Sequence, residues 1–221
     1  TQASLVASGN QNLVHSPSVA TSQITLTGGS GVGTVSYSVN GTSTNLCTVS
    51  ATGLVSQLHA GSCLINITKA SDTNYNVATT TFTIEVAKAT QSPLTVSGNQ
   101  SITYVVSPVS TTQVTASGGS SSTAITYQST TPSVCSASNT GLVSAVGAGR
   151  CSVTISRYGD PDYESVSTFY VITVAKGSQS ALTVRTEATL NFNATTPATT
   201  TITVTGGSTT GVVTLSTTSS T

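Results

Sequence analysis

Four cysteines are the residues of this chain with the plainest chemistry. They form two pairs with the same separation, Cys47 with Cys63 and Cys135 with Cys151. A zinc site is the alternative, but no Cys-x-x-Cys spacing accompanies them. We therefore expect one disulfide within each pair, closing a loop that the chain-entropy model values at about 3 kcal/mol. Disulfides persist in oxidising compartments, so the pairs predict an extracellular protein, secreted or attached to a cell surface.

A short acidic cluster, Asp160, Asp162 and Glu164, is the one place where several carboxylates lie close in sequence. In a turn, Asp-Pro-Asp-Tyr-Glu offers oxygen ligands to Ca²⁺. The matching segment 72–76 carries one aspartate and two asparagines, which would make a poorer site. The other interpretation is an Asx-type turn, in which an aspartate accepts backbone N–H hydrogen bonds. We expect no metal ion and no cofactor, with calcium at this cluster kept as the alternative.

The two histidines, His15 and His59, are the imidazoles available to act as a general base. Neither recurs in the second copy of the sequence repeat described below, where Gly147 stands in place of His59. Hydrolytic catalysis needs a base beside a nucleophile. A histidine that is unique within a repeat is more often an ordinary surface residue, so we expect no enzyme activity.

Sugar attachment is a further chemistry that the sequence allows. Four Asn-x-Ser/Thr sequons occur, at Asn40, Asn66, Asn99 and Asn193. Chance supplies several sequons in a chain this rich in serine and threonine. Because only 5% of the residues are charged, solubility must come from hydroxyl groups or from attached sugars. We keep N-glycosylation at these four asparagines as a prediction.

Two tyrosines, Tyr75 and Tyr163, occupy matching positions after a tight turn. Such a tyrosine can bury its ring under the corner and hydrogen-bond the backbone, as tyrosine corners do in β-sandwiches. The functional alternative is an aromatic platform for a glycan. Aromatic residues make up only 5% of the chain, which favours the structural interpretation.

The elements that must position these residues recur with a period of about 88 residues, the distance from Cys47 to Cys135. Three further runs recur at this period: Gly53–Ser56 as Gly141–Ser144, Asp72 and Tyr75 as Asp160 and Tyr163, and Val86–Lys88 as Val174–Lys176. Such repetition indicates tandem copies of one structural unit. We predict two complete repeats, residues 1–88 and 89–176, and the first half of a third, residues 177–221.

Within each copy, apolar and polar residues alternate with period two, as in Ile24–Thr27, Ile65–Thr68 and Phe82–Val86. This alternation is typical of half-buried antiparallel strands, and glycine-rich runs between them indicate turns. Seven or so short strands in each copy predict an all-β fold of tandem immunoglobulin-like β-sandwiches, with one disulfide in each complete repeat.

Each sandwich needs its own core, and alternation suggests which side chains fill it. The bulkiest expected core residues are aromatic: Tyr37, Phe82, Tyr127 and Phe169. Leu54 and Leu142 are expected to be buried at equivalent places. Each would contribute about 1.5–3 kcal/mol by transfer out of water.

The run Cys-x-x-Ser-x-Thr-Gly-Leu-Val-Ser-x-x-x-Ala-Gly-x-Cys spans Cys47 to Cys63 and again Cys135 to Cys151. With the alternating strand and the Asp-x-x-Tyr element that follow, it resembles the bacterial immunoglobulin-like repeats of large secreted and surface-anchored proteins, adhesin stalks included. The resemblance covers both complete repeats and part of the third. It implies a tandem β-sandwich fold, whereas such modules serve as spacers, binding tips and fibre subunits alike.

Charge excludes two classes of partner. Six basic and six acidic side chains give a formal net charge of zero, whereas nucleic acid and anionic membranes are captured by clustered Lys and Arg. The apolar runs are too short to insert into a bilayer. We expect a structural segment of an extracellular fibre or adhesin stalk, whose partners are neighbouring repeats or copies of itself. The alternative is a glycan- or protein-binding module that recognises a host or surface ligand through the turns 118–122 or 160–164.

The third copy reaches Thr221 before any cysteine. A half sandwich would expose an apolar face, here Leu190, Phe192, Ile202 and Val204, together with unpaired strand edges. We expect the natural chain to supply the missing strands beyond Thr221. Completion by a strand from a neighbouring molecule, which would make the chain a self-assembling filament subunit, is the alternative.

Overall fold

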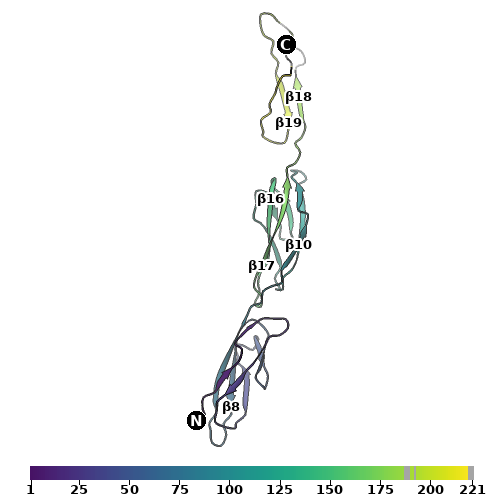
Figure 1. Cartoon of the computed structure of the whole chain (residues 1–221). Coiled ribbons are helices and arrows are strands. Elements are labelled where there is room, and N and C mark those ends of the chain that lie inside the picture. Colours follow the sequence, from purple (N-terminus) through teal and green to yellow (C-terminus); the bar gives the residue numbers. More distant parts are fainter. Residues whose placement is uncertain (187–189, 192, 219–221) are drawn as a thin grey trace.

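The computed structural model describes residues 1–186, 190–191 and 193–218. Within these ranges the chain consists of strands, turns and loops, with no helix. Figure 1 shows three bodies stacked end to end, from the N-terminal sandwich in purple, through a second sandwich in teal and green, to a yellow strand pair. We call them repeat 1, repeat 2 and the third segment, and keep the predicted limits of 1–88, 89–176 and 177–221 as names.

Repeat 1 is a sandwich of two facing layers. Its strands are β1 Val6–Ser8, β2 Asn12–Val14, β3 Thr21–Gln23, β4 Thr25–Thr27, β5 Val35–Val39, β6 Cys47–Val49, β7 Leu54–Gln57, β8 Gly61–Lys69 and β9 Ala78–Ala87. The long sheet has the order β2-β9-β8-β5, with β2 parallel to β9. The short sheet has the order β3-β7-β6. β4 directly follows β3 in the chain and pairs with β1 as a separate two-stranded sheet.

Repeat 2 has the same two layers. Its strands are β10 Leu94–Gly98, β11 Ser101–Thr103, β12 Thr111–Gly118, β13 Ile125–Ser129, β14 Cys135–Ala137, β15 Leu142–Ala145, β16 Gly149–Arg157 and β17 Val166–Ala175. The long sheet has the order β11-β17-β16-β13 and the short sheet β10-β12-β15-β14. The single strand β12 corresponds to β3 and β4 of repeat 1. The tandem immunoglobulin-like sandwich predicted from the sequence is therefore present.

Each sandwich has its own core, filled from both layers. In repeat 1 the buried cluster is Leu13, Ile24, Cys47, Val55, Cys63, Ile65, Ile67, Phe82, Ile84 and Val86. In repeat 2 it is Val114, Cys135, Val143, Ala145, Cys151, Val153, Ile155, Tyr170, Ile172 and Val174. Tyr37 and Tyr127 pack against these clusters in partly buried positions. The alternating Val and Ile residues thus build the cores as expected.

The predicted burial of Leu54 and Leu142 is wrong by one residue. Leu142 is 41% exposed, whereas Val143 beside it is fully buried, and repeat 1 has the same arrangement. The cause is the turn before each strand, which places Gly141 at φ +83° and sets the strand register. Since successive residues of a strand point to opposite sides of the sheet, a shift of one residue exchanges the core face and the solvent face.

The predicted burial of Phe169 is also wrong. It is 68% exposed, and the adjacent Tyr170 takes the buried place that Phe82 holds in repeat 1. The hydroxyl of Tyr170 donates a hydrogen bond to the carbonyl of Gly98 at 2.6 Å. This bond satisfies the polar end of a ring that otherwise lies in an apolar core. Phe169 corresponds instead to the exposed Thr81.

The described part of the third segment contains two strands, β18 Leu182–Thr186 and β19 Ile202–Gly206, paired antiparallel as β10 and β12 are. Of the apolar side chains expected to be exposed, Leu190 and Ile202 are exposed, whereas Val204, which pairs with Val184, is half-buried. Phe192 lies outside the described residues.

In the part of the chain that the structure describes, no helix has the length and hydrophobicity needed to cross a bilayer.

Candidate functional site

Both predicted disulfides are formed, and each joins the two layers of its sandwich. Cys47 on β6 is bonded to Cys63 on β8, with Cα atoms 6.0 Å apart, and Cys135 on β14 to Cys151 on β16, with Cα atoms 5.6 Å apart. All four side chains are buried. Because a reductant or partner protein cannot approach buried sulfur atoms directly, these bonds hold the layers together and are not a reactive site.

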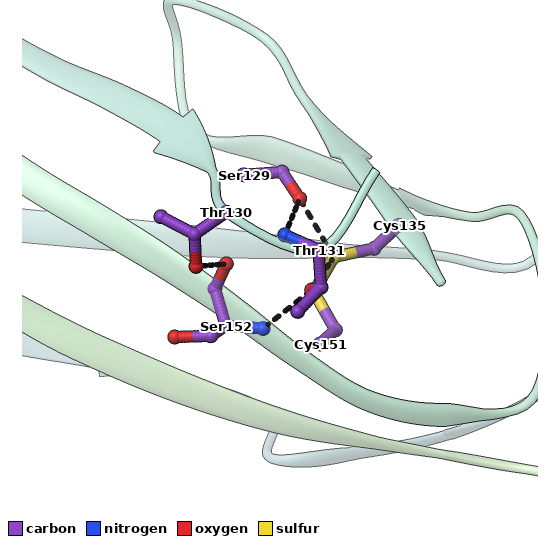
Figure 2. The surroundings of a disulfide bond; sticks show 6 residues. All are labelled: Ser129, Thr130, Thr131, Cys135, Cys151 and Ser152. Atoms are coloured by element: carbon purple, nitrogen blue, oxygen red, sulfur yellow. Dashed lines mark hydrogen bonds between the residues drawn. A yellow bond between two sulfur atoms is a disulfide. The ribbon is translucent and has the colours of Figure 1, made fainter. Parts of the chain in front are cut away.

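Figure 2 shows the hydroxyl groups that surround the second disulfide. Ser129 Oγ lies 3.3 Å from Cys135 Sγ and accepts a hydrogen bond from the N–H of Thr131 at 3.2 Å. Thr131 Oγ1 in turn accepts one from the N–H of Ser152 at 2.9 Å. These hydroxyls satisfy backbone donors where the chain leaves β13 and approaches the disulfide. The corner is a structural support.

Asp160, in the loop between β16 and β17, forms the Asx-type turn that was the alternative to a calcium site. Its Oδ1 accepts hydrogen bonds from the N–H groups of Asp162 and Tyr163, each at 3.0 Å, and its Oδ2 accepts one from the N–H of Ser122 at 2.8 Å. The Ser122 bond is the main cause that lowers the pKa of Asp160. Asp72 makes the equivalent turn in repeat 1.

The acidic cluster does not assemble as a set of metal ligands. Among the described residues, no group of three or more histidine, cysteine, aspartate or glutamate side chains could hold a metal ion. The oxygens of Asp160 already accept backbone N–H groups, and Glu164 is exposed. This arrangement favours the turn over the calcium site.

The side chain of Asp162, a residue of repeat 2, contacts repeat 1. Its Oδ2 lies 2.8 Å from Nδ1 of His59, and its Oδ1 accepts a hydrogen bond from the N–H of Ala60 at 2.8 Å. Nδ1 of His15 lies 3.7 Å from the same Oδ1. The Asp162 side chain is only 17% exposed and that of His15 12%, while His59 is 55% exposed. One carboxylate thus connects two loops of repeat 1 to the β16–β17 loop of repeat 2.

Contacts within repeat 1 fix the orientation of the His15 ring. Gln57 donates a hydrogen bond through Nε2 to the carbonyl of Ser16 at 2.7 Å, which turns its Oε1 toward Nδ1 of His15 at 2.9 Å. Nδ1 of the neutral ring is therefore the protonated nitrogen. The same ring meets Tyr163 of repeat 2 edge to face, with centroids 5.3 Å apart. The sequence did not predict this contact of Tyr163 with repeat 1.

Backbone hydrogen bonds also hold the linker between the two repeats. The N–H of Ala89 donates to the carbonyl of Asp162 and the N–H of Glu164 donates to the carbonyl of Ala89, both at 2.9 Å. Lys88 Nζ donates to the carbonyl of Asp160 at 2.7 Å. Little of the chain between β9 and repeat 2 is therefore free to move. We call the contacts of His15, His59, Ala60, Lys88 and Ala89 with residues 160–164 the junction.

Electrostatics at the junction favour the charged carboxylate. Burial alone would raise the pKa of Asp162. The hydrogen bonds from His59 and Ala60, with the charges of His15 and His59, outweigh that effect and hold the pKa below its ordinary value. A lowered carboxyl pKa means that the ionised form is stabilised by its surroundings. Asp162 is thus an ionised acceptor facing two imidazoles of the neighbouring sandwich.

Sequence reasoning treated the two histidines and the acidic cluster separately and missed this arrangement. Three residues of the junction, His15, His59 and Asp162, differ between the two copies of the repeat. Tyr104, Gly147 and Asn74 stand at the positions equivalent to His15, His59 and Asp162. Many other positions also differ between the copies, so these three differences alone do not identify the contact.

The two turns proposed as ligand-binding elements contact each other at the end of repeat 2 that faces repeat 1. Ser121 is buried, and its N–H donates to Gln91 Oε1 at 3.0 Å. Ser122 binds Asp160, as described above. These contacts leave the turns 118–122 and 160–164 little freedom to adapt to a ligand.

The four predicted glycosylation sites lie on the surface to different degrees. Asn99 and Asn193 are exposed, while Asn40 and Asn66 are half-buried. Asn66 lies within β8, whereas the other three lie in loops. Glycosylation at these asparagines stays a prediction.

No protein-family model and no curated protein matches the chain. Similar solved structures include mouse cadherin-23 EC22-24, with 15% identity and a TM-score of 0.36 over 79% of this chain and 65% of that one. Domains 1-6 of the surface layer protein SbsC show 14% identity and a TM-score of 0.31 over 93% of this chain and 36% of that one. The C-terminal 282-residue fragment of intimin, in complex with the intimin-binding domain of its translocated receptor, shows 14% identity and a TM-score of 0.28 over 85% of this chain and 67% of that one. The chain thus spans two-thirds or less of the cadherin-23 and SbsC fragments. These likenesses are weak, and the fold described above rests on the strands and cores of this chain alone.

Proposed function

We propose that the chain is a structural segment of an extracellular fibre or adhesin stalk, built of tandem immunoglobulin-like domains of the bacterial repeat type. We assign it no catalytic role. Its main partners are the neighbouring repeats, and sugars on its sequons would add to its solubility.

The junction is the observation that carries this proposal. A stalk must hold its domains in line, and inter-domain interfaces within a chain are by default mobile. Here the linker residue Ala89 is hydrogen-bonded on both sides, and Asp162 reaches back to His59 and Ala60. The arrangement supports a stack with a restricted angle between domains.

The disulfides and the surface composition support the same role. Each disulfide ties a short-sheet edge strand to the long sheet, which would resist separation of the layers under load. With few charges, the outer faces of the long sheets carry hydroxyl and amide side chains, for example Thr79, Thr81 and Ser167. Oxidising surroundings outside the cell are the compartment in which such disulfides persist.

Small-angle X-ray scattering of the chain tests the proposal. We expect an extended particle whose distance distribution has a long, well-defined tail. Inserting six Gly/Ser residues between Lys88 and Ala89 should broaden and shorten that distribution, because the flexible tract frees the repeats. The matched control is the same insertion after Gly41, which faces open space in a surface turn. If the unaltered chain and the Lys88 insertion variant scatter alike, the junction does not hold the repeats in line and the stalk proposal fails.

A binding role remains the second candidate, favoured by two exposed aromatic residues of repeat 2. Phe169 lies on β17 and Tyr158 just after β16, and both side chains are more than half exposed. The equivalent residues of repeat 1 are Thr81 and Ala70. Exposed aromatic rings suit stacking against sugars. A glycan array probed with the chain and with Phe169→Ala and Tyr158→Ala variants tests this role, which requires binding that both substitutions weaken.

A further inference from the structure

The junction between repeats 1 and 2 brings two imidazoles of one sandwich against a carboxylate of the next. We infer that His15, His59 and Asp162 form a pH-sensitive latch, which holds the two repeats together more tightly when the imidazoles are protonated. This inference goes beyond the proposed stalk role and does not depend on it.

The geometry of the three side chains meets the requirement of a latch. Both imidazoles belong to repeat 1, and the carboxylate belongs to repeat 2, so every attraction among them acts across the junction. His59 Nδ1 touches one carboxylate oxygen at 2.8 Å, and His15 Nδ1 lies 3.7 Å from the other. Because Asp162 and His15 are mostly shielded from water, their interaction is screened less than that of exposed charges.

The direction of the pH effect follows from which nitrogen atoms of the two imidazoles carry a proton. In the neutral rings Nδ1 already carries a proton, so His59 donates to Asp162 without a full charge. Protonation of the second nitrogen leaves that hydrogen bond in place and adds a positive charge opposite the carboxylate. Separating the repeats would remove this attraction. Contact between repeats 1 and 2 is therefore favoured as the pH falls through the interval in which histidine side chains gain a proton.

Other charged groups near the junction do not reverse this sign. Lys88 directs its ammonium group to the carbonyl of Asp160, and the Asp160 carboxylate is held by backbone N–H groups. Glu85 accepts a hydrogen bond from Ser62 on the repeat 1 side, and Glu164 is exposed on the repeat 2 side. Tyr163 presents its ring to His15. Lysine, carboxyl and tyrosine groups ordinarily change charge outside pH 5 to 8, which leaves the two histidines as the groups that respond there.

The latch is specific to this junction. The loop of repeat 1 that corresponds to the acidic cluster carries Asn74, which has no negative charge. The end of repeat 2 that meets the third segment carries Tyr104 and Gly147 in place of the histidines. A cavity lined by Tyr104, Val106, Gly177 and neighbouring residues lies there instead. The pH response should therefore be confined to the junction of repeats 1 and 2.

Amide hydrogen exchange measured by NMR on the whole 221-residue chain, in the presence of EDTA, tests the latch. The reporter is the N–H of Ala60, which donates to Asp162 across the junction, and the internal control is the N–H of Tyr163, which donates to Asp160 within repeat 2. Protection factors are corrected for the intrinsic pH dependence of exchange. From about pH 8 to about pH 5.5, we expect protection at Ala60 to rise about two- to fivefold, the range given by exposed ion pairs. Protection at Tyr163 should stay constant.

Two variants and one matched control complete the test. Asp162→Asn keeps an acceptor for the Ala60 N–H but removes the charge, and it should abolish the rise. Asn74→Asp adds the same charge at the equivalent position of repeat 1, away from the histidines, and should leave the rise unchanged. If Asp162→Asn also alters protection at Tyr163, the loop has moved, and His59→Gln replaces it as the deciding variant with an expected partial loss. Equal protection at Ala60 at both pH values in the unaltered chain would overturn the latch, as would an undiminished rise in the deciding variant.

Discussion

Truncation of two neighbouring residues, Val143 and Leu142, gives a sharp test of the strand register in repeat 2. Val143 is fully buried, and replacing it with alanine removes two carbon groups worth about 0.8 kcal/mol each by transfer. The cavity left behind adds to this loss, for a total of about 2–3 kcal/mol. Leu142 loses three carbon groups, but it is 41% exposed. Solvent fills the space it leaves, so Leu142→Ala should cost only about 1 kcal/mol.

The assay is urea unfolding of the disulfide-bonded chain, followed by NMR signals of repeat 2 so that its transition is separated from that of repeat 1. Val143→Ala should lower the midpoint at least twice as much as Leu142→Ala. Val55 and Leu54 form the same pair in repeat 1 and should show the same order in that repeat's own transition. If Leu142→Ala is the more damaging of the two, the register described here is wrong.

Three further predictions concern single features. Reducing the disulfides should lengthen the unfolding step of each repeat in a single-molecule pulling experiment by about 50 Å, because the bond withholds a loop with a sequence separation of 16 residues and itself spans about 6 Å between Cα atoms; an unchanged step would mean that the bonds are absent. Gly141→Ala should destabilise repeat 2 by about 1–3 kcal/mol in urea unfolding, since φ is +83° and a Cβ atom would lie 2.2 Å from the Val114 carbonyl oxygen; a neutral effect would contradict the turn. The pKa of Asp72 is lowered, chiefly by the hydrogen bond from the Asn74 N–H. The stability that the ionised Asp72 carboxylate contributes is therefore present above its ordinary pKa of 3.8 and is lost as the pH falls through the lowered pKa. Hydrogen exchange should show the Asn74 amide losing protection only in strong acid, and a loss of protection already above pH 3.8 would refute the assignment.

The fold and the disulfides could be predicted because they follow from local, repeated features. Alternation of Ile65 and Ile67 with polar residues determines which face of β8 is buried. Cys47 and Cys63 recur at the same separation in the second repeat, which made pairing within each repeat the natural expectation.

Register could not be predicted where two neighbouring residues are both apolar. Phe169 and Tyr170 are both aromatic, and Leu142 and Val143 are both aliphatic, so the pattern itself allows either residue of each pair to face the core. The left-handed turn at Gly141 decides the second case. In the first case, the bond from the Tyr170 hydroxyl to the Gly98 carbonyl lets a polar ring occupy the core. Both causes depend on three-dimensional contacts.

The junction lay beyond the reach of sequence patterns because its members are far apart in the chain. His59 and Asp162 are separated by 103 residues and meet only when two sandwiches are stacked. Each residue taken alone has an ordinary interpretation, a surface histidine or a turn aspartate. Both residues differ between the copies of the repeat, but so do many other positions, and the sequence therefore does not connect them.

The orientation of repeat 2 on repeat 1 is the property on which the stalk and the junction both depend. Residual dipolar couplings of backbone amides, measured in a weakly aligned sample at about pH 5.5, report that orientation directly. If the junction holds, one alignment tensor fits the couplings of both sandwiches together, with the relative orientation of Figure 1. Two tensors of clearly different magnitude would show that the repeats move independently, and would contradict the account of a domain stack fixed through Ala89 and Asp162.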